Sequence, residues 1–118
     1  MDQNGNGRKI EIRLDSGDFT YVPSLKHVKP GDGIYWACND GPFAVSFPDG
    51  TPFDVVTIKS NPANGTTPFQ TDQQTILDVP GGVYHYHVAV AALKKADGDR
   101  ITGAEVHMDS GCPGIEIP

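Results

Sequence analysis

The 118-residue sequence has no long apolar run, few basic side chains and only two cysteines. No stretch approaches the length of about 18 apolar residues that a membrane-spanning helix needs, so we predict no membrane span. Lys and Arg total 9 against 15 Asp and Glu, and the basic residues are scattered along the chain. Because phosphate binding requires a concentrated positive patch, we expect no nucleic-acid partner.

The N-terminal residues do not resemble a signal peptide. Residues 1–7 are polar and rich in Gly and Asn, without a basic segment or an apolar segment behind it. We therefore expect either a cytoplasmic protein or an exported one whose signal has been removed. A chain of this length suits one hydrophobic core, so we predict a flexible tail over 1–7 and a single domain over 8–118.

Helical periodicity is also missing. Residues 89–96 are the one candidate helix, and they reach an Asp-Gly pair too soon to form more than a turn or two. The 14 Gly and 10 Pro lie between short apolar runs, a pattern typical of brief strands joined by turns. The expected strands cover residues 10–14, 19–22, 34–38, 43–47, 75–79, 83–90 and 115–117, with a short return from 101 and a long connection over 51–72 that holds one short strand.

This pattern predicts an all-β protein, a Greek-key β-sandwich or barrel of seven to eight strands. Tyr84, Tyr86 and Val88 share one parity of their strand. Since alternate residues of a strand point to the same face, we expect these three side chains to point inward, beside Phe43 and Phe47.

Two stretches carry a family resemblance. Residues 28–36 read Val-Lys-Pro-Gly-Asp-Gly-Ile-Tyr-Trp and are followed by Asn39-Asp40, which resembles the Val-x-Pro-Gly-Asp, Trp and Asn pattern of cupredoxins. Residues 79–86 read Val-Pro-Gly-Gly-Val-Tyr-His-Tyr, which is similar to the Pro-Gly-x-Tyr-x-Tyr entry into the penultimate long strand of that family. The resemblance covers about half of the chain and implies the cupredoxin-like, blue-copper protein fold.

The resemblance does not extend to the copper ligands. A type 1 site needs a thiolate, two imidazoles and a weak axial thioether. The family's first histidine falls here on Phe43 and its cysteine on Val88, and Ala-Ala-Leu-Lys-Lys replaces the segment that carries the remaining histidine and methionine. We therefore interpret Phe43 as core packing and expect no type 1 copper and no other cofactor.

The function expected from these residues is a non-enzymatic, cupredoxin-like domain with a binding or structural role. The sequence contains no Gly-x-Ser-x-Gly nucleophile turn and no recognisable calcium loop. Its partner would be an unknown protein or small ligand, or a second copy that pairs through edge strands.

The two cysteines leave three interpretations. In a cupredoxin-like sandwich the end of the Trp strand and the start of the last strand lie at the same end, which would make Cys38 and Cys112 neighbours. A disulfide would stabilise an exported protein by about 2 to 4 kcal/mol, whereas a cytosolic protein would keep two buried thiols. The third interpretation is a copper-handling or electron-transfer protein, with an unconventional copper site formed by Cys38, His107, Met108 and Cys112.

Two further alternatives remain open. His85 and His87 lie two apart on one predicted strand, a spacing that can chelate zinc or copper, although we favour a solvated sheet face because no third ligand is evident. An immunoglobulin-like module that binds carbohydrate or protein is the other alternative, with Tyr35 or the loop at Tyr21 and Val22 as the contact surface.

Overall fold

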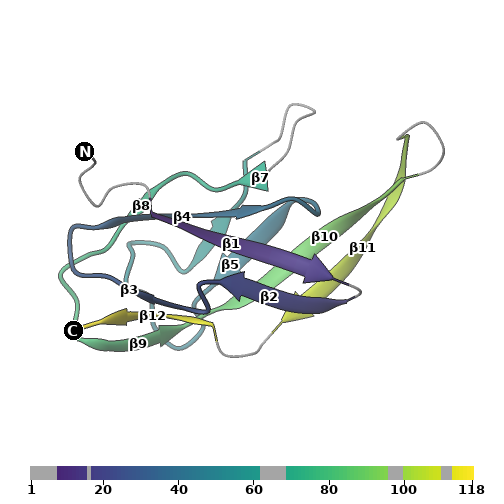
Figure 1. Ribbon diagram of the computed structural model, residues 1–118. Coiled ribbons are helices and arrows are strands. Elements are labelled where there is room, and N and C mark those ends of the chain that lie inside the picture. Colours follow the sequence, from purple (N-terminus) through teal and green to yellow (C-terminus); the bar gives the residue numbers. More distant parts are fainter. Residues whose placement is uncertain (1–7, 16, 62–68, 96–99, 110–112) are drawn as a thin grey trace.

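The protein is all-β, as predicted. The computed structural model describes residues 8–15, 17–61, 69–95, 100–109 and 113–118, and every regular element in these ranges is a β-strand (Figure 1). The strands are β1 (Arg8–Asp15), β2 (Asp18–Val22), β3 (Leu25–His27), β4 (Gly33–Cys38), β5 (Phe43–Ser46), β6 (Thr57–Lys59), β7 (Phe69–Gln70), β8 (Gln74–Thr75), β9 (Gly82–His85), β10 (His87–Lys95), β11 (Ile101–Asp109) and β12 (Gly114–Ile117). The described residues contain no helix long and apolar enough to cross a membrane.

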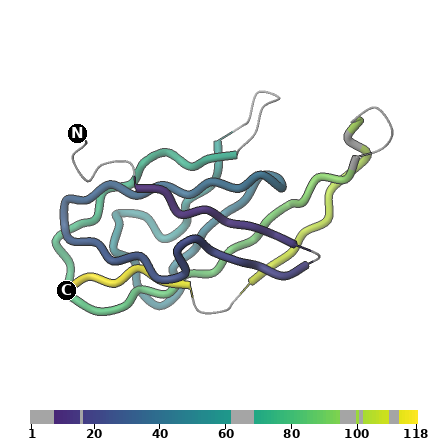
Figure 2. The backbone as a smooth tube through the Cα atoms, viewed as in Figure 1, coloured from purple at the N-terminus to yellow at the C-terminus, as the bar shows by residue number. Residues whose placement is uncertain are grey.

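The strands form three sheets. The first has the order β2-β1-β4-β7 with β8 also paired to β4, the second has the order β11-β10-β5-β6, and the third has the order β3-β12-β9. Strand β1 runs parallel to β4, and β3 runs parallel to β12, while the other pairs are antiparallel. The hairpin of β10 and β11 projects well beyond the remaining strands (Figures 1 and 2).

The core lies between the sheets and is built around aromatic rings. Trp36 and Tyr86 are fully buried, with ring centroids 5.5 Å apart in an edge-to-face arrangement. Phe47 and Phe53 pack edge-to-face against Trp36 at centroid distances of 6.3 and 5.9 Å. Aliphatic side chains from all three sheets complete the cluster, among them Ile10, Val88 and Ile115. Such aromatic pairs add stability beyond the area that they bury.

The Pro-Gly-Asp turn positions β4. Gly31 adopts a φ of 95°, a left-handed conformation that glycine accepts without steric cost. The buried Asp32 carboxylate accepts the Lys29 amide at 3.1 Å, and the Asp32 carbonyl accepts the Ile76 amide at 2.9 Å. The turn therefore connects the chain before β4 to the segment that follows β8.

The prediction of one strand over residues 83–90 is wrong, because this segment forms two strands that belong to different sheets. Strand β9 ends at His85 and pairs with β12, whereas β10 begins at His87 and pairs with β5 and β11. Tyr86 lies at the break, where its side chain enters the core and its amide donates to the Pro113 carbonyl at 3.2 Å. The side chains of residues 83–90 alternate without interruption, but hydrogen bonds to distant strands divide this segment into β9 and β10.

Other strand predictions also need correction. Residues 89–95 belong to β10 and form no helical turn, and the return after Ile101 is a strand of nine residues. The connection over 51–72 holds β6 and β7, so it contains two strands instead of one. The strand predicted over 75–79 is reduced to β8, and residues 76–79 form no strand. The described residues form twelve strands, where seven or eight were predicted. The predicted tail over 1–7 lies outside the described residues.

Candidate functional site

The positions that correspond to copper ligands in cupredoxins lie in the hydrophobic core. Phe43 is 5% exposed and Val88 is 1% exposed, and both belong to the same buried cluster. They stand on neighbouring strands, where Phe43 is opposite Val90 and Val88 is opposite Val45. The interpretation of Phe43 as core packing is confirmed. Hydrocarbon side chains occupy both positions, and neither can donate an electron pair to a metal.

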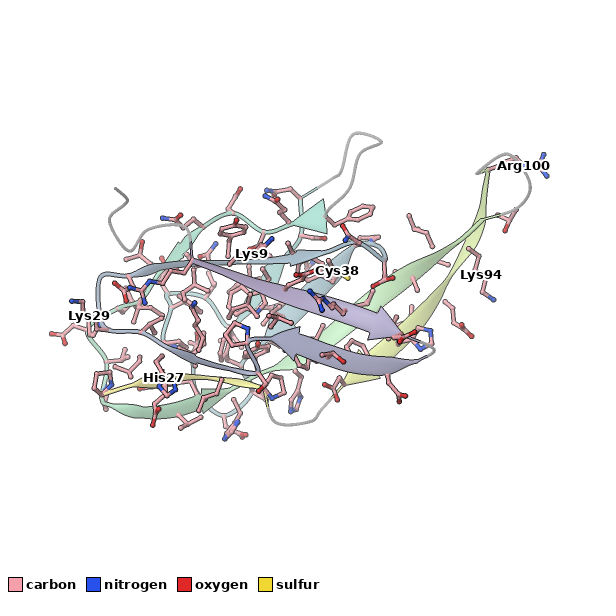
Figure 3. All side chains as sticks on the ribbon, in the orientation of Figure 1. Lys9, His27, Lys29, Cys38, Lys94 and Arg100 are labelled. Carbon is pink, nitrogen blue, oxygen red and sulfur yellow. The ribbon has the colours of Figure 1, made fainter. Side chains whose placement is uncertain are left out.

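Cys38, labelled in Figure 3, ends β4 and is fully buried in the same core cluster as Phe43 and Val88. Its thiol lies 3.7 Å from Asp40 Oδ2, to which it donates a weak hydrogen bond. Burial raises the pKa of Cys38, although the backbone amide of Asp40 acts in the opposite direction. A thiol with a raised pKa is a poor nucleophile and a poor metal ligand at neutral pH. Cys112 lies outside the described residues, so the disulfide and the copper site that include it remain predictions.

Asp40 joins three strands at this end, a role that the sequence did not reveal. Its carboxylate accepts the Leu14 amide of β1 at 3.1 Å as well as the Cys38 thiol of β4, and its carbonyl accepts the Leu93 amide of β10 at 3.0 Å. The next residue, Gly41, has no room for a Cβ because the Ala91 carbonyl is in direct contact. The Asn-Asp-Gly segment therefore links the two larger sheets.

His107 and Met108 are neighbours in β11 and point to opposite faces of it. His107 is half-buried, with Nε2 3.2 Å from Glu105 Oε1 on the same face, whereas Met108 is 78% exposed. Because successive strand residues alternate between faces, the two side chains cannot converge on one ion while β11 remains a strand. Asp109 ends the strand and accepts the Tyr21 hydroxyl at 2.5 Å.

His85 and His87 are not on one strand, contrary to the premise of the predicted chelating pair. His85 is exposed in β9, and His87 is half-buried in β10, where it pairs with Ser46. The described residues contain no group of three or more His, Cys, Asp or Glu side chains placed to hold a metal ion.

An open groove of about 530 Å³ lies at the opposite end of the sandwich, where Figure 3 labels His27 and Lys29. In this groove His27 Nδ1 lies 2.7 Å from Glu116 Oε1 across the β3–β12 pair. Arg8 Nη1 lies 3.6 Å from Asp32 Oδ2 on the same wall. These acidic and basic groups face one another, so their charges are largely compensated within the groove.

The aromatic surface expected for an immunoglobulin-like module is mostly engaged in packing. Tyr35 is half-buried, and the Tyr21 ring stacks on Phe19 at 6.2 Å while its hydroxyl binds Asp109. Val22 remains exposed beside a cis peptide bond to Pro23. Tyr21 therefore serves as a contact between sheets rather than as a free recognition residue.

Two buried polar atoms in the core lack a hydrogen bond of standard geometry, the Trp36 indole nitrogen and the Tyr86 hydroxyl. Burial raises the pKa of Tyr86 to about 12, and the neighbouring Trp36 indole partly opposes the rise. Both side chains are fully enclosed, so they do not present their polar atoms to a ligand in solvent.

No protein-family model matches the chain, and no curated protein matches its sequence significantly. The resemblance to cupredoxins therefore rests on the sequence motifs alone.

Proposed function

We propose that this protein is a non-enzymatic, cupredoxin-like domain that works without type 1 copper and has a binding or structural role. The observation that carries the proposal is the core position of Phe43 and Val88, where two metal ligands would be expected. A copper site at these positions would require an imidazole and a thiolate in place of hydrocarbon.

Binding is favoured over catalysis by the state of the polar groups. In the groove at the β3–β12 end, Arg8 interacts with Asp32, and His27 interacts with Glu116. A catalytic site needs an acid, base or nucleophile aimed at a substrate position. The thiol of Cys38, the described cysteine, is enclosed and has a raised pKa.

A surface suited to a protein partner lies on the outer face of the β11-β10-β5-β6 sheet. A hollow of about 330 Å³ on this face is lined by the small apolar side chains of Ala44, Ala89, Ala91 and Val106, with Lys59 and Ser60 at the β6 side. Residues 88–93 of β10 read Val-Ala-Val-Ala-Ala-Leu without a polar position. Uninterrupted apolar strands of this kind are typical of sheets that are covered on both faces.

Copper titration tests the absence of a type 1 site. Reduced protein titrated with Cu(I) or Cu(II) and followed by calorimetry and visible absorption should give no thiolate-to-copper charge-transfer band. Cys38→Ser and Cys112→Ser are the matched variants. A band that either substitution abolishes would overturn the proposal in favour of the unconventional Cys38, His107, Met108 and Cys112 site. Mass measurement with and without reductant then shows whether the two cysteines are bridged.

A further inference from the structure

Strand β11 is the edge of its sheet and has no second neighbour within the described part of the chain. It is nine residues long, and its outer face carries exposed apolar side chains, with Val106 65% exposed and Met108 78% exposed. Long apolar edges of this kind are usually shortened, charged or interrupted by proline, because they otherwise pair with another chain.

The hydrogen bonds of β10 show which backbone groups of β11 face the open edge. The amides of Ala91 and Leu93 donate to the carbonyls of Pro42 and Asp40, on the side of β10 away from β11. In an antiparallel pair successive residues direct their N–H and C=O groups to opposite sides. The even-numbered residues of β10 therefore face β11, where they meet its odd-numbered residues.

The even-numbered residues of β11 are consequently the ones that direct their backbone groups outward. Up to the register shift at Lys94 and Lys95, these are Ala104, Val106 and Met108, and their side chains also share the outer face. Row by row, Met108 lies opposite Ala89 and Val106 lies opposite Ala91. An added strand would thus find donors, acceptors and an apolar surface in the same register.

We propose that this partner strand is β11 of a second copy, paired antiparallel across a two-fold axis at Val106. In this register Val106 meets its own copy and Ala104 meets Met108, and all of these residues point their backbone groups at the partner. Two-fold association of one surface patch with itself is the commonest form of protein oligomer. The inference rests on the proposed binding or structural role, and it names the partner.

The charged side chains of β11 favour the register centred on Val106 over registers centred on neighbouring residues. Glu105 and His107 share the face opposite to Val106 and already interact within one strand, with Nε2 and Oε1 3.2 Å apart. An axis at Val106 places Glu105 of each copy opposite His107 of the other, so the imidazole donates to a carboxylate across the interface. An axis at Glu105 would place two carboxylates opposite each other, which is unfavourable.

A second charged register fits less well. An axis at Met108 would place His107 opposite Asp109, but the Asp109 carboxylate already accepts the Tyr21 hydroxyl of β2 at 2.5 Å. The axis at Val106 leaves that contact intact.

The first test measures association and its location. Sedimentation velocity from about 1 μM to about 1 mM should show a monomer converting to a dimer, the range expected for a small interface. Hydrogen exchange at the two ends of this range should slow the amides of Ala104, Val106 and Met108 in the dimer. The amides of Glu105 and His107 are the internal control, because they are already bonded to β10. A monomer at every concentration, or a dimer without this alternating protection, would overturn the proposal.

Variants test the register. Val106→Lys should weaken the dimer by at least about tenfold because it places like charges at the axis, whereas Val56→Lys, at a site 55% exposed and outside every strand, should not. His107→Glu should also weaken the dimer, and the exchanged pair Glu105→His with His107→Glu should restore it. Failure of the exchanged pair to restore association would contradict the register. Copper binding by the monomer would overturn the proposed function but would not decide whether the dimer forms. A protein that binds no copper and stays monomeric would overturn the proposed dimer and leave the proposed function in place.

Discussion

Strand β10 carries apolar side chains on both faces, and the two faces differ in what covers them. On the inner face, Val88 and Val90 are enclosed beneath the aromatic cluster of Trp36 and Tyr86. On the outer face, Ala89 is half-buried and lines an open hollow together with Ala91 and Val106. The comparison indicates that the inner face stabilises the fold, while the outer face is available for association.

The largest expected effect is at the centre of the inner face. Trp36→Ala should lower the free energy of unfolding by about 3 to 5 kcal/mol, because it removes a fully buried ring that contacts three other aromatic residues. Urea denaturation followed by circular dichroism measures this change. A loss below about 1 kcal/mol would mean that the inner face does not depend on this ring.

Tyr86 should give the inner face a dependence on alkaline pH. Its pKa is raised from 10.0 to about 12 by burial, so the unfolded chain releases this proton first. The contribution of this hydroxyl to the free energy of unfolding is fully present below pH 10. It is lost as the pH rises toward 12, by about 2 to 3 kcal/mol. Tyr86→Phe should remove that part of the loss, and burial also raises the pKa of Tyr21, so some slope should remain. An unchanged slope in the variant would contradict the assignment.

Asp40 tests the connection between the two larger sheets. Asp40→Ala should destabilise the protein by about 1 to 3 kcal/mol, because the Leu14 amide loses its acceptor in a partly buried position. Asp40→Asn keeps an oxygen there and should cost less. Thermal unfolding of both variants beside the parent protein provides the measurement. Equal losses would show that the carboxylate charge, rather than the acceptor, matters.

The smallest effect on stability should come from the outer face. Val106→Ser should change the free energy of unfolding by no more than about 0.5 kcal/mol at low concentration, because the side chain is 65% exposed. At concentrations where the dimer forms, the same substitution should weaken association. A loss of stability in the monomer as large as that of a core substitution would show that the two faces are not different.

Much of the architecture was predictable because strand alternation and turn chemistry are local. The burial of Ile10, Ile12, Tyr86 and Val88 follows from their parity, and the all-β class follows from the distribution of Gly and Pro. The Greek-key connection and the cupredoxin type remain predictions. The number of strands was underestimated because β3 and β7 have only two or three residues and little pattern of their own, and because one predicted strand is divided at Tyr86.

The candidate site was less predictable because its parts are distant in sequence. Asp40 contacts both β1 and β10, and His27 finds Glu116 near the other end of the chain. The full length of β11 could not be predicted, because Gly103 and the exposed residues around it show little of the pattern typical of a strand. The break at Tyr86 separated two histidines that alternation alone placed on one face.

The sequence by itself determined which chemistry is possible at each position, above all that Phe43 and Val88 cannot bind copper, and which side chains alternate toward a core. Those properties depend on residue identity and on the two-residue period of a strand. The tertiary structure decided which strands are neighbours, where the chain leaves one sheet for another, and that the outward backbone groups of β11 remain open. These depend on hydrogen bonds between residues far apart in the chain, which no local pattern encodes.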